Sequence, residues 1–173
     1  MRRGLLTLLF GAWLAGGAAA QGPPAAPVNV NAEGLALHGH DAVAYFTQGK
    51  AVRGVAQFEH VWNGARWRFA SAANRDLFAM SPEQYAPQFG GYCAWAVSRN
   101  YTADTDPEAF AVVEGKLYVN YSSFVQARWR LDRAGNIQKG QANWPGLLAT
   151  SKAAASTGRT SVSAPAPAKK GGR

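Results

Sequence analysis

The sequence has few side chains that bind soft metals: one cysteine, two methionines and three histidines among 173 residues. A single cysteine excludes an intramolecular disulfide and every metal or redox motif that needs paired cysteines. No phosphate-binding glycine loop, dinucleotide-binding fingerprint or HExxH zinc motif is present. The apolar run near the start is too short to serve as a stable membrane anchor. The usual sequence signatures of nucleotide-dependent enzymes and zinc proteases are therefore missing.

Acidic residues are also scarce, with 10 Asp and Glu against 18 Lys and Arg, and a net charge of +8. Such a total is typical of nucleic-acid-binding proteins. The excess lies at the two ends, however, because residues 1–20 carry +2 and residues 150–173 carry +5. Residues 21–149 hold 11 basic and 10 acidic side chains. The region that can fold is nearly neutral, and we expect no nucleic-acid partner.

The first 20 residues have the pattern of a secretory signal peptide. Arg2 and Arg3 precede an apolar stretch over residues 5–15, and three alanines at 18–20 form a cleavage signal before Gln21. We therefore expect a periplasmic or secreted protein with no transmembrane anchor after cleavage. The arginine pair leaves the choice between general and twin-arginine export open.

Two low-complexity segments flank the region that can fold. Residues 21–34 form a spacer rich in proline and alanine, and residues 149–173 form a basic tail without aromatic residues. Such compositions predict disorder, and the tail has the charge for weak contact with an anionic surface. Residues 35–148 contain most of the 20 aromatic residues, so they can form a hydrophobic core. We expect one domain there and a monomeric protein.

A two-residue Asn63-Gly64 turn between residues 57–62 and 65–70 predicts a β-hairpin. This register places Phe58, His60, Trp62, Trp67 and Phe69 on one face of the hairpin. The predicted cross-strand pairs are Val61–Arg66, His60–Trp67, Glu59–Arg68 and Phe58–Phe69. Glu59 and Arg68 then lie on the other face, where they can form an ion pair.

Helix signals flank this hairpin. Asp41 can cap a short helix within residues 41–46, Ser71 can cap a helix over 72–80, and Pro82 suits the first position of another. The Gly90-Gly91 turn is predicted to lead into a buried strand or segment over residues 92–97.

The rest of the chain repeats the order of hairpin and helices. A short helix is predicted to start at residues 106–108, followed by a hairpin of 110–113 and 116–121 around Glu114-Gly115. Ser122 or Ser123 can cap a helix over 124–131. A last helix, about 136–148, is predicted to be interrupted at Trp144-Pro145-Gly146. This order predicts an α+β fold, with a small antiparallel sheet built from β-hairpins and short packed helices.

Cys93 is the residue on which a chemical function would depend. A thiolate binds Cu(I) or Zn(II), usually together with histidine or further cysteines. The candidate metal site combines Cys93 with His38, His40 and His60, and with the carboxylate of Asp41. The alternatives are that Cys93 is a small buried apolar residue, that His60 is a core histidine, and that His38 and His40 are exposed on a loop.

A second chemical reading makes Cys93 a nucleophile paired with a histidine. The Gly90-Gly91 turn could then supply backbone N–H groups to an oxyanion. No catalytic signature surrounds Cys93, so we expect that the protein is not an enzyme.

Several motifs in order resemble the YHS domain family, including its exported bacterial members. They cover residues 38–148 and are Asp41–Phe46, Trp62–Ser71, Phe78 with Pro82 and Tyr85, Gly90–Ala94, and Asn143–Pro145. The resemblance implies a small α+β domain, and many members of the family have no assigned activity. Related domains in metal-handling proteins carry cysteines as metal ligands, where this sequence has Ala70 and Asn74 and no cysteine at residues 42–44.

The first hypothesis is thus an exported, non-enzymatic YHS-type domain that binds a transition metal such as copper through Cys93 and histidine. The second is a module without metal that binds a partner or a small molecule through its aromatic surface. The third is a cysteine-dependent enzyme.

Overall fold

The computed structural model describes residues 26–157, with side-chain surroundings up to residue 149. The predicted signal peptide, the start of the spacer and most of the predicted tail lie outside these residues. Within the described part, no helix combines the length and apolar character needed to cross a membrane.

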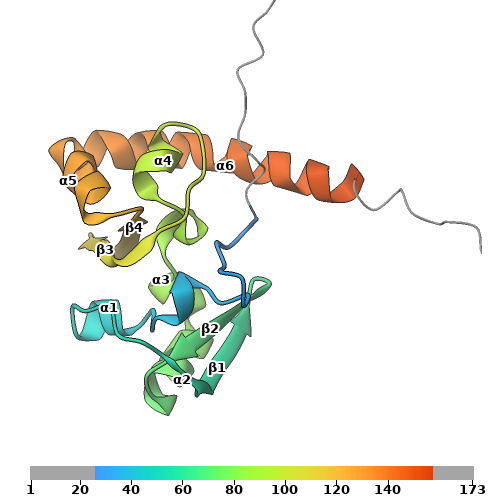
Figure 1. The fold of residues 1–173 in the computed structure, drawn as a ribbon, viewed down its shortest axis with the longest axis vertical. Helices are drawn as coiled ribbons and strands as arrows, with labels where there is room; N and C mark the ends of the chain where they lie inside the picture. The colour runs from blue at the N-terminus through green and yellow to red at the C-terminus, as the bar shows by residue number, and fades with distance from the viewer. Residues whose placement is uncertain (1–25, 158–173) are drawn as a thin grey trace, which may run out of the picture.

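The described residues form an α+β fold with two separate two-stranded antiparallel sheets, as the sequence predicts in outline. Figure 1 shows the first hairpin with α1 and α2 in one half, and the second hairpin with α4, α5 and α6 in the other. The elements of the first half are η1 (Leu37–Gly39), α1 (Ala44–Thr47), β1 (Val55–Trp62), β2 (Ala65–Phe69), α2 (Ala72–Met80) and α3 (Pro82–Tyr85). The second half contains η2 (Gln88–Gly91), α4 (Ala94–Ser98), β3 (Asp106–Val113), β4 (Lys116–Asn120), α5 (Ser123–Leu131) and α6 (Arg133–Thr157).

The first hairpin has the predicted register next to its turn. Glu59 pairs with Arg68 and His60 pairs with Trp67, and an ion pair of 2.6 Å joins Glu59 Oε1 to Arg68 Nε. Farther from the turn the prediction is wrong, because Val55 and not Phe58 lies opposite Phe69. An irregularity between residues 55 and 59 places extra residues in β1, as a β-bulge does.

The predicted aromatic face of this hairpin packs on Phe78 of α2. Phe78 is fully buried and contacts the rings of His60, Trp62, Trp67 and Phe69, with centroids 4.8–6.1 Å apart. Strand alternation supplies the four rings from one face, and the helix supplies the fifth. This cluster is the centre of the first core.

The predicted serine caps and the predicted proline at the start of a helix are confirmed, whereas Val43 and not Asp41 holds the N-cap position of α1. Ser71 Oγ accepts a hydrogen bond from the N–H of Asn74 and starts α2, and Pro82 occupies the first turn of α3. Ser122, rather than Ser123, caps α5 by accepting from the N–H of Val125. Each of the two serines satisfies a backbone donor that has no partner within its helix, and Pro82 stands where no backbone donor is needed.

Strand β4 lies between the two hydrophobic cores. Leu117 and Val119 pack in the first core with Phe78, while Tyr118 packs in the second with Trp129. Alternate side chains of a strand point to opposite faces, so a strand buried on both faces joins the two halves. This arrangement explains why the four residues 117–120 are all buried.

Of the two alternatives predicted for residues 92–97, the buried segment is correct and the strand is not. Residues 94–98 form the buried helix α4, because a short apolar run has no periodicity that separates helix from strand. Two further predictions about the second half are wrong. Residues 106–108 begin β3, where Pro107 is tolerated because the strand is at a sheet edge. Helix α6 continues through Pro145 to Thr157 and so includes the start of the predicted tail. Ile137, Trp144 and Leu147 hold it against the second core.

Candidate functional site

Cys93 lies in the interior, immediately before α4, and 1% of its surface is exposed. Its Sγ accepts a hydrogen bond from the N–H of Tyr121 over 3.3 Å and lies 3.9 Å from Oδ1 of the buried Asn120. Burial raises the pKa of the thiol, and backbone hydrogen bonds from Ala96, Tyr121 and Trp95 offset this effect only in part. The thiol is therefore protonated at neutral pH, which disfavours it as a nucleophile.

A mostly apolar cavity of 280 Å³ adjoins Cys93. Its walls contain no histidine and are formed by Cys93, Trp95, Ala96, Tyr101, Ala103, Tyr121 and Val125. The structure therefore surrounds Cys93 with the apolar groups expected of a small core residue.

The three histidines lie in different surroundings. His38 Nε2 is 2.8 Å from Oδ1 of Asp104, and His40 Nδ1 is 3.0 Å from the Leu37 carbonyl oxygen. Burial lowers the pKa of His40, and the hydrogen bond to Leu37 only partly opposes this. The His60 ring makes a T-shaped contact with Phe78 of the first core. The alternative of two exposed loop histidines is wrong for His40, which is buried. His38 is partly exposed.

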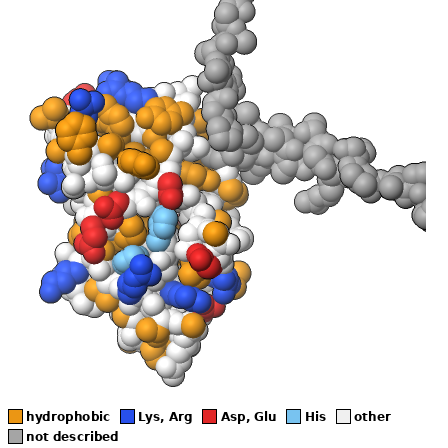
Figure 2. Space-filling model, viewed as in Figure 1, with side chains coloured by type: hydrophobic (Ala, Val, Ile, Leu, Met, Phe, Trp, Pro, Cys, Tyr) orange, Lys and Arg blue, Asp and Glu red, His pale blue; other side chains and the backbone are white. Residues whose placement is uncertain are grey.

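The histidine side chains visible near the middle of the face drawn in Figure 2 have acidic and basic side chains around them. Partial burial opposes the ionisation of Asp104, but hydrogen bonds from Asn29, Thr105 and His38 outweigh it and lower the pKa of that carboxyl group. Asp104 is thus ionised at neutral pH and orients the His38 ring.

Asp41 is a structural residue at the centre of the first half. It is fully buried, and Oδ1 accepts hydrogen bonds from the N–H groups of Val43 and Ala44 at the start of α1. Oδ2 accepts from the N–H of Ala70 and from the side-chain amide of Asn74. Ala70 and Asn74 therefore meet at one carboxylate, and hydrogen bonds occupy both of its oxygens.

The five predicted ligands do not form one site in the structure. Across residues 26–157, no three histidine, cysteine, aspartate or glutamate side chains lie close enough to hold a metal ion together. The reason is topological: Cys93 belongs to the second half, Asp41 to the start of α1, and His60 to the face of the first hairpin. Sequence spacing alone could not separate these locations.

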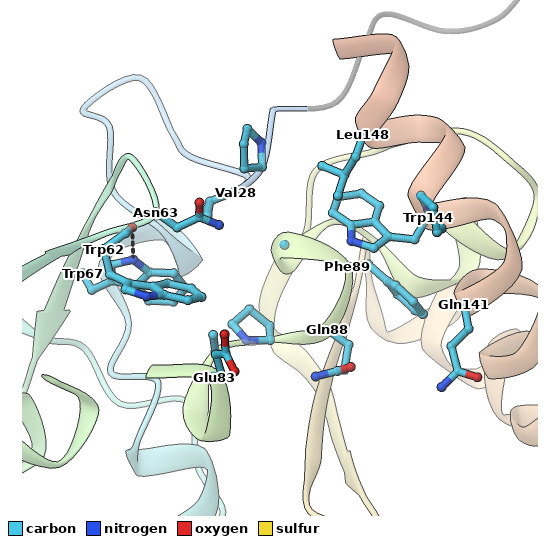
Figure 3. Close-up of a pocket in the computed structure, with 15 residues that line it drawn as sticks. Val28, Trp62, Asn63, Trp67, Glu83, Gln88, Phe89, Gln141, Trp144 and Leu148 are labelled. Atoms are coloured by element: carbon cyan, nitrogen blue, oxygen red, sulfur yellow. Dashed lines mark hydrogen bonds between the residues drawn. The ribbon is translucent and has the colours of Figure 1, made fainter. Parts of the chain in front are cut away.

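An aromatic cleft with a volume of 380 Å³ lies between the two halves. Figure 3 shows Trp62 and Trp67 of the first hairpin on one side, and Phe89 and Trp144 on the other. Three further segments close the cleft, and they contribute Pro27 and Val28, residues 86–88, and Gln141 with Leu148.

The ring positions in this cleft are well supported. Trp67 donates its Nε1–H to the carbonyl oxygen of Trp62 over 3.1 Å, and the two ring centroids are 5.9 Å apart. On the other side, Phe89 and Trp144 have centroids 6.2 Å apart. Trp67 and Phe89 are buried, whereas Trp62 and Trp144 are partly exposed. The cleft is thus formed before any ligand arrives, with two indoles accessible from solvent.

Close approach of the backbone also holds the cleft in shape. Gly90 has a φ of +60°, and a Cβ at this position would lie 2.3 Å from the Pro27 carbonyl oxygen. The N–H of Asn29 donates to the Gly90 carbonyl oxygen over 2.8 Å. The segment 27–29 therefore packs directly on η2 and becomes a wall of the cleft.

The sequence indicated an aromatic binding surface but not its composition. From the sequence, Trp144 is expected only at a helix interruption and in the Asn143–Pro145 motif, and residues 27 and 28 belong to the predicted spacer. A useful signal would have been the Trp144-Pro145 pair itself, because a proline inside a helix is costly and is retained only where packing compensates. No protein family, characterised protein or solved structure that was compared with this chain matches it.

Proposed function

We propose that residues 35–148 form an exported, non-enzymatic binding module of the YHS type, and that its ligand site is the aromatic cleft between Trp62 and Trp144. The single observation that carries this proposal is the composition of the cleft. It combines four aromatic rings with a few polar side chains in a preformed cavity of 380 Å³. Ligand sites in proteins are typically concave, mostly apolar and within this range of volume.

The position of the cleft gives further support. It lies between two hydrophobic cores, with Trp67 in the first and Phe89 in the second. Ligand sites occur preferentially at such junctions. The ordered motifs that resemble YHS domains supply residues to both walls, since Trp62 and Trp67 belong to one motif and Trp144 to another. We expect the ligand to be a small molecule or the side chains of a peptide.

Nuclear magnetic resonance of the indole N–H groups tests this proposal. We expect a set of small aliphatic, aromatic and amine compounds to include binders that shift the signals of Trp62, Trp67 and Trp144. Trp95 and Trp129 lie outside the cleft and serve as internal controls. Shifts confined to Trp95, which lines the cavity beside Cys93, would place the binding site there and contradict the proposal.

Two variants give the matched comparison. Trp144→Ala removes one wall of the cleft and should abolish the shifts of Trp62 and Trp67. Trp95→Ala removes an indole of the same size outside the cleft and should leave them unchanged. Equal loss of binding in both variants would indicate a general loss of folding rather than a site.

A further inference from the structure

We infer that the aromatic cleft recognises an organic cation, such as a trimethylammonium or alkylammonium group. This inference rests on the proposed function and adds the class of ligand. Aromatic rings attract cations through the negative potential of their faces, and the indole of tryptophan does so most strongly. Three of the four rings in the cleft are indoles.

The charge of the cleft fits a cation. Glu83 is its one charged lining residue, and the lining includes no lysine, arginine or histidine. Glu83 is exposed, and none of the ion pairs in the described part of the chain involves it. Figure 3 shows this carboxylate on the floor of the cleft, on the same side as Trp62 and Trp67. An approaching cation would therefore meet a free carboxylate and accessible indoles together.

Two aromatic rings outside the cleft already have a cation of their own. Arg99 lies 4.2 Å from the centre of the Trp95 ring, and Arg128 lies 4.9 Å from that of Phe124. In the described part of the chain, no such contact involves Trp62, Trp67, Phe89 or Trp144. Within the described residues, the partly exposed rings of Trp62 and Trp144 therefore have no cation of their own and can meet one from outside, whereas Trp67 and Phe89 are buried.

The neutral polar groups of the cleft suit a ligand with a polar end. Asn63, Gln88 and Gln141 lie around the aromatic rings and can donate to or accept from a hydroxyl or carbonyl group. The rest of the lining is mostly apolar, and there the methyl groups of a quaternary ammonium would be removed from water. A fully hydrated inorganic cation lacks this apolar contact, so the cleft should discriminate against it.

The test compares choline with 3,3-dimethylbutan-1-ol, which has the same shape but a carbon atom in place of the charged nitrogen. Binding to the purified full-length chain is followed by calorimetry and by the indole signals of Trp62 and Trp144. We expect choline to bind at least about tenfold more tightly than the neutral compound. Sodium ions at the same concentration should cause no shift of the indole signals.

Glu83→Gln should weaken choline binding about two- to five-fold at low salt, and the difference should shrink at high salt. Glu114→Gln is the matched control, because Glu114 is also exposed but lies in the β3–β4 turn outside the cleft. Trp144→Phe keeps an aromatic ring and should retain part of the affinity, whereas Trp144→Ala should lose about tenfold or more. Melting curves of each variant identify any that fail to fold.

Equal binding of the two compounds would overturn the cation inference while leaving the proposed cleft function in place. If neither compound binds, the cation inference is also overturned. The proposed function is then tested separately by the set of aliphatic, aromatic and amine compounds. Occupation of the cleft by a second copy of the chain would appear as a dimer in sedimentation, with no binding of choline, and would also overturn it. If neither Glu83→Gln nor Trp144→Ala changes choline binding, choline binds outside the cleft and the inference is overturned.

Discussion

The side-chain amide of Asn74 donates a hydrogen bond of 2.7 Å to Oδ2 of Asp41, although 33 residues separate them in the chain. This contact ties the start of α1 to α2 through one buried carboxylate. Four donors converge on its two oxygens, so the charge is compensated by hydrogen bonds without an ion pair.

We predict that Asp41→Ala destabilises the protein by about 3 kcal/mol, because it leaves several buried donors without an acceptor. Chemical denaturation followed by tryptophan fluorescence measures the change. Asp76→Ala is the control, since the Asp76 side chain is 60% exposed and paired only with its neighbour Arg75. We expect a cost below about 0.5 kcal/mol for the control. Similar losses in the two variants would mean that the hydrogen bonds of Asp41 contribute little.

Two glycines of α6 should respond to alanine in opposite directions. A Cβ at Gly140 would lie 2.6 Å from Cζ of Phe89, whereas a Cβ at Gly146 would meet nothing within 4 Å. Gly140→Ala should therefore cost about 1–3 kcal/mol through overpacking against Phe89. Gly146→Ala should stabilise by about 0.5–1 kcal/mol, because alanine favours the helical backbone.

Thermal melting of the two variants measures these changes in the same helix. The Gly146→Ala variant controls for helix propensity, which alone would stabilise both proteins. A stabilising Gly140→Ala change would show that Phe89 moves away at little cost. In that event, the wall of the cleft formed by Phe89 and Trp144 would be less rigid than the structure indicates.

We predict that the Cys93 thiol of the folded protein reacts with a disulfide reagent at neutral pH more slowly than the same thiol in 6 M urea. Burial both restricts access and raises its pKa, so the thiolate that reacts is rare. The rates of Ellman's reagent with native and unfolded protein provide the measurement. A native rate above the unfolded rate would favour the cysteine-dependent enzyme hypothesis.

The same pKa shift has a consequence for stability at alkaline pH. A thiol with a raised pKa in the folded state favours folding below its unfolded pKa, which is near the ordinary value of 9.0. This contribution is lost as the pH rises from that value through the folded pKa. The stability difference between the wild type and Cys93→Ala should thus be constant from pH 6 to 8 and should change above pH 9.

Local signals in the sequence accounted for much of the fold. The Asn63-Gly64 turn, the Ser71 and Ser122 caps and Pro82 each act through backbone groups within a few residues, so their effects are readable without tertiary structure. The prediction was wrong where distant contacts decide. The apolar run 94–98 is helical, and α6 continues through Pro145 because Trp144 and Leu147 pack on the second core.

For the candidate site too, the sequence and the tertiary structure each determine a different part. By itself the sequence determined which chemistry is available: one thiol, three imidazoles, many aromatic rings and a nearly neutral folded region. Only the tertiary structure decided which of these groups meet. Chain topology places Cys93, Asp41 and His60 in separate surroundings and brings Trp62 and Trp144 to opposite walls of one cleft. The reason is that side chains distant in sequence are brought together by the packing of whole elements, which local preferences do not specify.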